Sequence, residues 1–408
     1  MNTPAMPPPK SLEGPEHIVV VGAGAAGLTS VETLRREGFT GRLTLIGGES
    51  SPPYDRPPLS KQVLAGTWDF PQLLLRPMDH YAGLDVELRT GCRARGLDLP
   101  GRTVHFDQGG QLPFDGLLIA TGVAPRRLPF AEGLDGVHVL RGEHDAAALR
   151  EHLWQEPRVV VIGAGFLGLE AAAVVRDLGL DVSVVDPQPV PMERQLGTQA
   201  GALVAGLHRE RGVRLYTGRG VTDLVGGARV TGVRLGDGTL LDADCVLVAI
   251  GATPQVEWLR SSTVPLADGV TCDAYCQAAP GVYAAGDVAS WLSARYGRRM
   301  RLEHRMNATE QGIVAARNLL HGNVETYDPL PYFWTDQYEV KIQVYGVIPA
   351  GAEMTVVEGD PAEGAFVALF HAAGRPAAVL GWNSPKHLRR YRQQLLETTS
   401  FEVCETGA

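Results

Sequence analysis

The chain has 408 residues, of which 44% are hydrophobic, so it is long enough for two or three domains with sizeable cores. Its 37 basic and 46 acidic residues give a net charge of −9, which excludes a chain that binds nucleic acid over its whole surface. No apolar run approaches the roughly 18 residues of a membrane-spanning helix, so we expect no membrane partner.

The first residues, MNTPAMPPPKSLE, are rich in proline and lack the apolar core of a secretory signal. We therefore expect a disordered leader over 1–13.

The cysteines are sparse, odd in number and without a CxxC pair, which is typical of a reducing, cytoplasmic location. They are Cys92, Cys245, Cys272, Cys276 and Cys404. For the close pair Cys272 and Cys276, two unconnected thiols are the favoured interpretation, with a redox disulfide or a metal site as the alternatives. The spacing of His and Cys residues predicts no metal site.

A glycine motif follows the first predicted strand. The segment HIVVV (17–21) is apolar throughout, as in a buried strand, and 25–39 is apolar at helical spacing. The segment GRLTLIGG (41–48) predicts a second strand. A strand–helix–strand unit of this length is the setting in which a glycine motif binds a dinucleotide.

The glycines of this first cradle have separate roles. Gly22 makes the tight turn, Gly24 lets the backbone approach a pyrophosphate, and Gly27 lets the helix lie close to the strand. The start of the helix offers free N–H groups and the positive end of its dipole to the phosphates. Glu49, 22 residues after Gly27, is the nearest carboxylate for an adenosine ribose.

The segment RVVVIGAG (158–165) begins a second unit of the same kind, with Gly163, Gly165 and Gly168 in the same three roles. Its second strand ends in Asp186, 18 residues after Gly168, close to the roughly 20 expected of a carboxylate that binds ribose hydroxyls. No arginine directly follows Asp186 to receive a 2′-phosphate, so the site is predicted to prefer NADH over NADPH, although Arg194 lies eight residues further on.

Three later segments are apolar strands that end in small residues. FDGLLIATGVAPR (114–126) and ADCVLVAIGATPQ (243–255) each predict a strand that closes a sheet and passes the chain to another domain. Gly251, in the second of them, is expected beside the bound NAD. PGVYAAGDVA (280–289) ends in Asp287, which either caps a helix or accepts a hydrogen bond from a cofactor's sugar-like chain.

Two further segments make these motifs specific: PPYDRPPLSK (52–61) and PYFWTDQYEVKIQVYG (331–346). Together with the two cradles they make the chain resemble, from about residue 16 onward, the FAD-dependent NAD(P)H:ferredoxin reductases of bacterial oxygenase systems. The putidaredoxin reductases and biphenyl dioxygenase reductases are of this type, within the two-dinucleotide-binding flavoprotein superfamily.

The resemblance implies an α/β fold with two Rossmann-like dinucleotide-binding domains, for FAD and NAD, as in glutathione reductase, and an α+β C-terminal domain. The FAD domain is expected over 14–122 and 254–326, the NADH domain over 123–253, and the C-terminal domain over 327–408.

The resemblance also implies the activity: electrons pass from NADH through FAD to an iron–sulfur ferredoxin, which feeds a monooxygenase or dioxygenase. NADH gives electrons in pairs and iron–sulfur proteins accept them singly, so a flavin is needed between them. Independently, the absence of cysteine from residues 28–91 argues against disulfide reduction. The alternatives are an NADH oxidase or monodehydroascorbate-type reductase, and an NADH-sensing flavoprotein like apoptosis-inducing factor.

Carried over by motif, the expected catalytic residues are Lys61, Glu170 and Trp334. Lys61 would lie against the reacting edge of the flavin, Glu170 would position the nicotinamide, and Trp334 would lie near the flavin. The further FAD contacts expected from the resemblance are Ala94, Arg141, Asp287 and Arg305, the last at a position where we expect Trp or Val.

Ferredoxins are typically acidic, so a basic segment is a candidate docking site. The residues proposed for docking are Arg295, Arg298, Arg299 and Arg301, which closely follow Asp287. A second basic cluster on the predicted late helix, with Lys386 and Arg389, is interpreted as a solvated helix face.

Overall fold

The computed structural model describes residues 14–107 and 109–398, so the leader predicted over 1–13 lies outside the described residues. A six-stranded sheet combines distant parts of the chain in the order β20-β21-β7-β1-β2-β3. Its strands are β1 (His17–Val21), β2 (Arg42–Ile46), β3 (Glu87–Arg89), β7 (Gly116–Ile119), β20 (Gln277–Ala279) and β21 (Val282–Ala284). The parallel pairings of β1 with β2 and β7 bury the apolar run predicted from the sequence.

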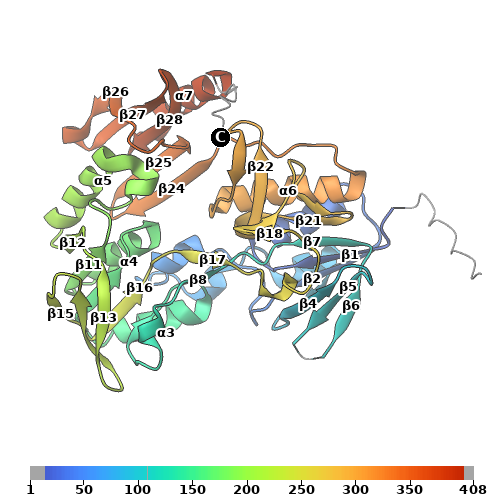
Figure 1. Cartoon of the computed structure of the whole chain (residues 1–408), viewed down its shortest axis with the longest axis horizontal. Helices are drawn as coiled ribbons and strands as arrows, with labels where there is room; N and C mark the ends of the chain where they lie inside the picture. Colours follow the sequence, from blue (N-terminus) through green and yellow to red (C-terminus); the bar gives the residue numbers. More distant parts are fainter. Residues whose placement is uncertain (1–13, 108, 399–408) are drawn as a thin grey trace, which may run out of the picture.

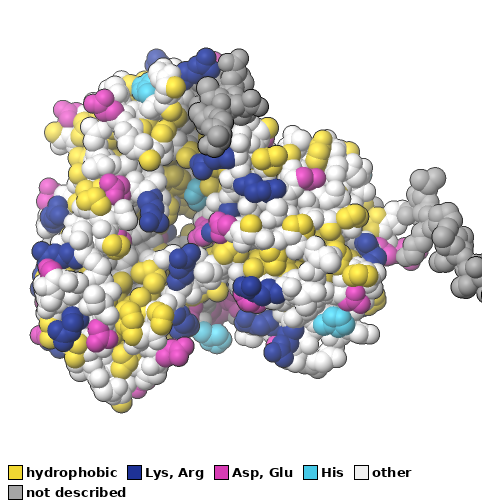
Figure 2. All heavy atoms as spheres, in the orientation of Figure 1, with side chains coloured by type: hydrophobic (Ala, Val, Ile, Leu, Met, Phe, Trp, Pro, Cys, Tyr) yellow, Lys and Arg dark blue, Asp and Glu magenta, His cyan; other side chains and the backbone are white. Residues whose placement is uncertain are grey.

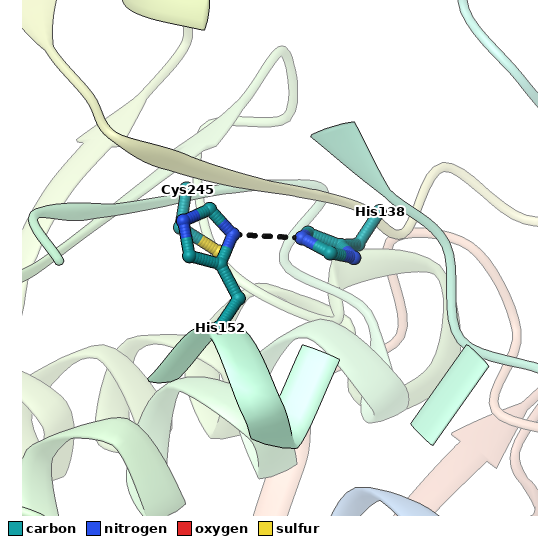
Figure 3. Close-up of side chains that lie close together, drawn as sticks. All are labelled: His138, His152 and Cys245. Atoms are coloured by element: carbon teal, nitrogen blue, oxygen red, sulfur yellow. Dashed lines mark hydrogen bonds between the residues drawn. The ribbon is translucent and has the colours of Figure 1, made fainter. Parts of the chain in front are cut away.

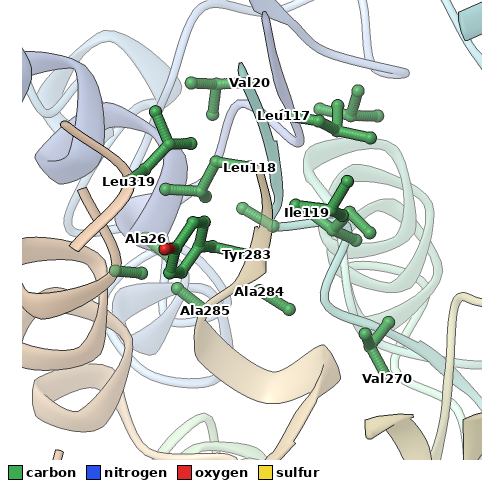
Figure 4. Close-up of a cluster of buried hydrophobic side chains, with 14 of the residues drawn as sticks. Val20, Ala26, Leu117, Leu118, Ile119, Val270, Tyr283, Ala284, Ala285 and Leu319 are labelled. Atoms are coloured by element: carbon green, nitrogen blue, oxygen red, sulfur yellow. The ribbon is translucent and has the colours of Figure 1, made fainter. Parts of the chain in front are cut away.

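Two helices cover this sheet, α1 (Ala25–Arg36) and α6 (Arg305–His321). They pack closely at Gly312, where an added Cβ would lie 2.7 Å from the Ala26 carbonyl oxygen. Ser30 Oγ donates to the Gly312 carbonyl at 3.1 Å across the same contact. Figure 4 shows the core beneath them, in which side chains of β7 and β21 lie among those of Ala26 and Leu319.

The second glycine unit forms a five-stranded parallel sheet in the order β12-β11-β10-β16-β9. Its strands are β9 (Val137–His138), β10 (Val159–Ile162), β11 (Val182–Asp186), β12 (Arg214–Thr217) and β16 (Cys245–Val248). The helices of this part are α3 (Glu143–Leu153), α4 (Phe166–Asp177) and α5 (Glu193–Glu210). The expected fold class, with two Rossmann-like units, is confirmed.

The chain passes between the two sheets through a pair of short antiparallel strands. These are β8 (Val123–Pro125) and β17 (Ala252–Pro254), which directly follow β7 and β16. Contrary to the expectation, the strands of these two segments do not close their sheets: β7 lies between β21 and β1, and β16 lies between β10 and β9. After each of them the chain enters the β8–β17 pair.

The C-terminal part is an antiparallel sheet in the order β24-β25-β28-β27-β26. Its elements are β24 (Tyr332–Gln337), β25 (Val340–Gly346), β26 (Met354–Asp360), β27 (Ala365–Ala372), β28 (Arg375–Trp382) and α7 (Pro385–Thr398). The short helix α2 (Met78–Gly83) lies between β2 and β3 in the sequence, and three smaller sheets hold the remaining strands of the described chain. Their strands are β4 (Ala94–Asp98), β5 (Thr103–Phe106), β6 (Gln111–Pro113), β13 (Val221–Gly226), β14 (Val230–Leu235), β15 (Leu240–Asp242), β18 (Leu266–Ala267), β19 (Gly269–Thr271), β22 (Ala289–Ser293) and β23 (Arg298–Met300).

Figure 1 shows three lobes around a common centre, with β8 and β17 running between the lobe of β1 and the lobe of β16. The C-terminal sheet lies beside α4 and α5, and β24 is the strand that faces the centre. Among the described helices, none is long and apolar enough to cross a membrane.

Candidate functional site

A cavity of about 840 Å³ lies where the three lobes meet, a size typical of cofactor pockets. The first cradle lines it with Gly22 and Gly24, the second unit with Glu170, and the C-terminal sheet with Trp334. Figure 2 shows this face of the molecule hollowed between the lobes, with Lys and Arg side chains on both sides of the hollow. One cavity therefore reaches both dinucleotide units.

The first cradle has the space that a pyrophosphate requires. Gly22 has φ +121°, and an added Cβ would lie 2.0 Å from the Ala120 carbonyl oxygen. At Gly27 an added Cβ would lie 1.9 Å from the Gly22 carbonyl oxygen, so the helix packs against the turn. A Cβ at Gly24 would meet nothing within 4 Å, and α1 begins at the next residue. The open approach to the helix start fits the phosphates of FAD.

The second cradle repeats this geometry. Gly163 has φ +110°, and an added Cβ would lie 2.3 Å from the Ala249 carbonyl oxygen. At Gly168 an added Cβ would lie 2.0 Å from the Gly163 carbonyl oxygen. Gly165 again faces open space, just before α4. Gly251, with φ +93°, is exposed and equally open. These glycines fit a second dinucleotide.

Backbone N–H groups hold the side chain of Asp186, the last residue of β11, beside the turn between β10 and α4. Its Oδ2 accepts from the Ala164 N–H at 2.6 Å and its Oδ1 from the Gln188 N–H at 2.8 Å. Arg194, which the sequence offered as the arginine nearest to a 2′-phosphate, is exposed. The structure adds Arg219, whose N–H donates to the Asp186 carbonyl at 3.1 Å and whose guanidinium pairs with Asp237 at 3.0 Å. Its one sequence signal is its position two residues past β12, the strand beside β11.

Lys61 and Glu170 form an ion pair at the cavity wall, with 2.9 Å between Nζ and Oε2. The lysine side chain is 16% exposed and the glutamate side chain 8%, so water screens the pair weakly. Ser60, at the end of a short 3₁₀ helix over Pro57–Ser60, donates to the same oxygen at 2.6 Å. Thr335 Oγ1 donates to the other oxygen at 2.9 Å. Two residues predicted to be catalytic are thus in contact, and sequence reasoning missed Ser60 and Thr335.

Glu49 lines the cavity and is fixed by Arg56 and Tyr54. Its Oε1 pairs with Arg56 Nη2 at 2.5 Å, and its Oε2 accepts from the Tyr54 hydroxyl at 2.5 Å. Burial alone would raise the pKa of Glu49, but the Arg56 guanidinium outweighs it and holds that pKa below its ordinary value. The Glu49 carboxylate therefore stays an acceptor, as a contact to ribose hydroxyls requires.

Arg141 and Asp287, both predicted FAD contacts, pair with each other at 3.1 Å on the cavity wall. Asp287 follows β21 at the start of a 3₁₀ turn, where its side chain makes no helix cap among the described residues. The cap interpretation is therefore replaced by an ion pair at the cavity. Ala94, the first residue of β4, also lines the cavity.

Trp334 lines the cavity on the side of the C-terminal sheet. It stacks on Tyr332 with 6.0 Å between ring centroids, and Tyr332 stacks on Tyr345 at 4.5 Å. On the other face of β24, Phe333 contacts Phe166 at the start of α4, with 5.0 Å between the ring centroids. The tryptophan is therefore held in place by aromatic neighbours.

Arg305 lies at the start of α6 and its Nε is 2.5 Å from Asp55 Oδ1. It links α6 to the PPYDRPPLSK segment at the cavity wall. The preceding residue, His304, also lines the cavity, and its buried Nδ1 has no hydrogen-bond partner within the described residues. Burial lowers the pKa of His304 to about 4.

The four arginines proposed for docking differ in their surroundings. Arg298 and Arg299 are exposed on β23, although Arg299 also donates to the Cys272 carbonyl at 2.8 Å. Arg301 is 13% exposed and pairs with both Asp268 and Glu303, so its charge is compensated. The backbone N–H of Arg295 donates to Asp328 at 3.0 Å. Arg298 and Arg299 are thus the exposed residues of this set, whereas Arg295 and Arg301 are half-buried.

Cys272 and Cys276 are buried free thiols, which agrees with the favoured interpretation.

His138, His152 and Cys245 form a group that sequence spacing did not reveal, with their possible metal-binding atoms all within 4.8 Å of one another. Figure 3 shows that the two imidazole rings are hydrogen-bonded to each other, with 2.9 Å between His138 Nε2 and His152 Nδ1. One ring's lone pair is therefore already used by the other's N–H, and burial lowers the pKa of His138 to about 4 and raises that of the Cys245 thiol to about 12. The two rings thus form a neutral pair in which His152 is buried and His138 is half-buried, and the expectation that no metal is bound stays a prediction.

Comparison with known proteins agrees with this geometry. Residues 16–312 match the pyridine nucleotide-disulphide oxidoreductase family, and residues 332–405 match the reductase C-terminal family. The chain is 36% identical over 388 residues to the ferredoxin–NAD(+) reductase component of the p-cumate 2,3-dioxygenase system from Pseudomonas putida, covering 94% of each chain.

Two crystal structures are similar over most of their length. The ferredoxin reductase for the CYP199A2 system from Rhodopseudomonas palustris is 34% identical, with a TM-score of 0.90 over 94% of this chain and 95% of that chain. The covalent putidaredoxin reductase–putidaredoxin complex contains a chain that is 32% identical, with a TM-score of 0.89 and 94% of each chain covered.

Proposed function

Since the chain belongs to the pyridine nucleotide-disulphide oxidoreductase family, as a ferredoxin–NAD(P) reductase, we propose that it passes electrons from NADH through FAD to an iron–sulfur ferredoxin that feeds an oxygenase. The observation that carries the proposal is one cavity that is lined both by the first cradle and by the start of α4, the helix that follows the second cradle, and that has the Lys61–Glu170 pair in its wall. FAD, when bound, takes an electron pair from NADH and releases electrons singly.

The chain's own residues divide the binding between two sites. For FAD we propose the first cradle at the pyrophosphate, Glu49 at the ribose, and Arg141 with Asp287 further along the cofactor. Ala94 and Arg305 would complete the walls of the site. Lys61 brings a cation to the wall and Glu170 holds it in place, while Trp334 covers the C-terminal side.

For the nicotinamide nucleotide we propose the second cradle, with Gly251 beside it and Asp186 at the ribose. A carboxylate there binds free ribose hydroxyls and repels a 2′-phosphate, which supports a preference for NADH. Arg219 lies next to Asp186 and is the cation that could offset this repulsion.

We propose domain boundaries at 122/123 and 253/254, supported by the β8–β17 crossing, and at 326/327, before β24.

A cytoplasmic location is supported by the four free cysteines among the described residues, because reduced thiols are usual in the cytoplasm.

Electrons must leave through a docked protein. The segment 28–91, which follows the first cradle, contains no cysteine, so no thiol pair is available there to take electrons. The exposed Arg298 and Arg299 support docking of an acidic ferredoxin on β23.

The test is reconstitution with the purified yellow protein, NADH and candidate ferredoxins, followed by cytochrome c reduction. We expect turnover that depends on added ferredoxin. Fast NADH oxidation with oxygen alone, unchanged by any ferredoxin, would overturn the proposal.

A further inference from the structure

A chain of buried hydrogen bonds leads from the Glu170 carboxylate away from the cavity. Thr335 Oγ1 donates to Glu170 Oε1 at 2.9 Å, and Gln337 Nε2 donates to Thr335 Oγ1 at 2.8 Å. Gln337 Oε1 and His208 Nε2 are 3.0 Å apart. Thr335, Gln337 and His208 are each 0% exposed, so water cannot take the place of any of these bonds.

The chain is assembled from elements that are far apart in the sequence. Glu170 lies on α4 and His208 on α5, both beside the second parallel sheet, whereas Thr335 and Gln337 lie on β24. Alternation along β24 points residues 333, 335 and 337 to the same, buried face. The C-terminal sheet therefore reaches Glu170 through two side chains of a single strand.

The hydrogen bonds of this chain have one direction. A threonine hydroxyl has a single hydrogen, and because Gln337 donates into Thr335 Oγ1, that hydrogen is directed to Glu170. The amide of Gln337 takes this orientation because its oxygen accepts from His208 Nε2. His208 Nδ1 then carries no hydrogen and faces the Tyr338 hydroxyl at a long 3.5 Å. The tautomer of His208 thus determines the direction in which the Thr335 hydroxyl donates its hydrogen.

This arrangement suits positioning and does not suit proton transfer. An amide side chain interrupts any relay, because Gln337 has no readily exchangeable acidic proton to pass on. All the donors in contact with Glu170, namely Ser60, Lys61 and Thr335, offer hydrogens to it. With both oxygens held from two sides, the carboxylate has little freedom to rotate away from Lys61.

We propose that Thr335, Gln337 and His208 are positioning residues, which hold the Glu170 carboxylate, and through it the Lys61 ammonium, in the pose used when NADH reduces the flavin. The proposal rests on the function proposed above for the Lys61–Glu170 pair. It adds that the C-terminal domain sets the geometry of that pair through a hydrogen-bond chain rather than through Trp334 alone.

The first test compares Thr335→Val with Thr335→Ser in the FAD-loaded protein. Valine keeps the shape and removes the hydroxyl, whereas serine keeps the hydroxyl. We expect Thr335→Val to slow flavin reduction at saturating NADH by about tenfold, with unchanged FAD content, because a hydrogen bond to a charged group is lost. Thr335→Ser should stay within about twofold of the wild type.

The second test has a readout that does not depend on activity. Nitrogen-15 NMR of histidine-labelled protein, assigned with His208→Gln, should show His208 as the neutral tautomer with the proton on Nε2. His208→Gln keeps a donor near the position of Nε2 and should retain most of the rate, whereas His208→Leu removes it and should slow flavin reduction several-fold.

Two results would overturn the inference: an Nδ1–H tautomer of His208, or a Thr335→Val variant that loses thermal stability yet reduces its flavin at the wild-type rate. Neither result would touch the proposed function, which fails only if NADH does not reduce the flavin of the wild-type protein.

Discussion

Lys61 Nζ lies 2.9 Å from Glu170 Oε2, although the two residues are 109 positions apart. The lysine comes from the segment after the first cradle and the glutamate from the first helix of the second. Since both side chains are mostly shielded from water, removing either one leaves a charge without its partner. The pair therefore joins the segment that follows the first cradle to the helix that follows the second.

Replacing Lys61 by methionine should keep FAD bound but slow flavin reduction by NADH about tenfold to a hundredfold. The loss corresponds to about 1.5–3 kcal/mol for a charge-assisted hydrogen bond. Stopped-flow bleaching of the flavin measures it. Lys341→Met is the matched control, because Lys341 is 51% exposed and only loosely paired with Asp336, at 3.8 Å. If both variants bleach at the wild-type rate, Lys61 only packs the turn.

Replacing Asp186 by alanine should lower kcat/KM for NADH about tenfold to a hundredfold, for the loss of about 1.5–3 kcal/mol of charged hydrogen bonding. It should also narrow the preference over NADPH, because the repulsion of a 2′-phosphate is gone. Arg219→Ala, the companion variant, should reduce NADPH use and leave NADH use nearly unchanged. An unaltered NADH/NADPH ratio in Asp186→Ala would contradict the role given to this carboxylate.

The glycine cradles could be predicted because their chemistry is local. Strand, turn and helix are consecutive, so the spacing of Gly22, Gly24 and Gly27 already determines how the backbone approaches a phosphate. The expected catalytic residues came from motif resemblance, and the structure brings Lys61 and Glu170 into contact.

What could not be predicted depends on packing between distant elements. Thr335 and His208 meet through Gln337 only because β24 lies against α4 and α5, and no sequence spacing encodes that contact. Likewise, nothing in the run of arginines shows that Arg301 is compensated by Asp268, which lies on the turn between β18 and β19. Pairing partners of surface charges are set by the tertiary fold.

The stability of the protein should fall as the pH falls from about 6.5 toward 4. Burial lowers the pKa of His208 from 6.5 to about 4. In that window the unfolded chain binds a proton at this site that the folded chain does not, so the free energy of unfolding decreases, on the order of 2–3 kcal/mol at most from one such group. Calorimetry of wild type and His208→Gln at pH 7.5 and pH 5 checks this. The variant should lose less stability on acidification, and equal losses would show that His208 titrates normally.

Reversing Arg298 and Arg299 to glutamate should raise the apparent KM for ferredoxin and flatten its salt dependence. Steering by these charges weakens as the Debye length falls from about 30 Å at 0.01 M salt to about 10 Å at 0.1 M. NADH-to-ferricyanide turnover should stay unchanged. The double variant Arg209→Glu/Arg234→Glu, on exposed positions of α5 and β14, makes the same change in net charge away from β23 and is the control. A wild-type KM at low salt in the first variant would move the docking site elsewhere.

The central claim, that electrons enter in pairs from NADH and leave singly to a ferredoxin, is tested most directly by an anaerobic titration. The FAD-loaded protein, in catalytic amount, is mixed with excess oxidised ferredoxin, and NADH is added in steps while the spectra of both partners are recorded. The account predicts two one-electron ferredoxins reduced for each NADH consumed. If NADH bleaches the flavin and the ferredoxin stays oxidised, the chain passes its electrons to another acceptor and the account is wrong.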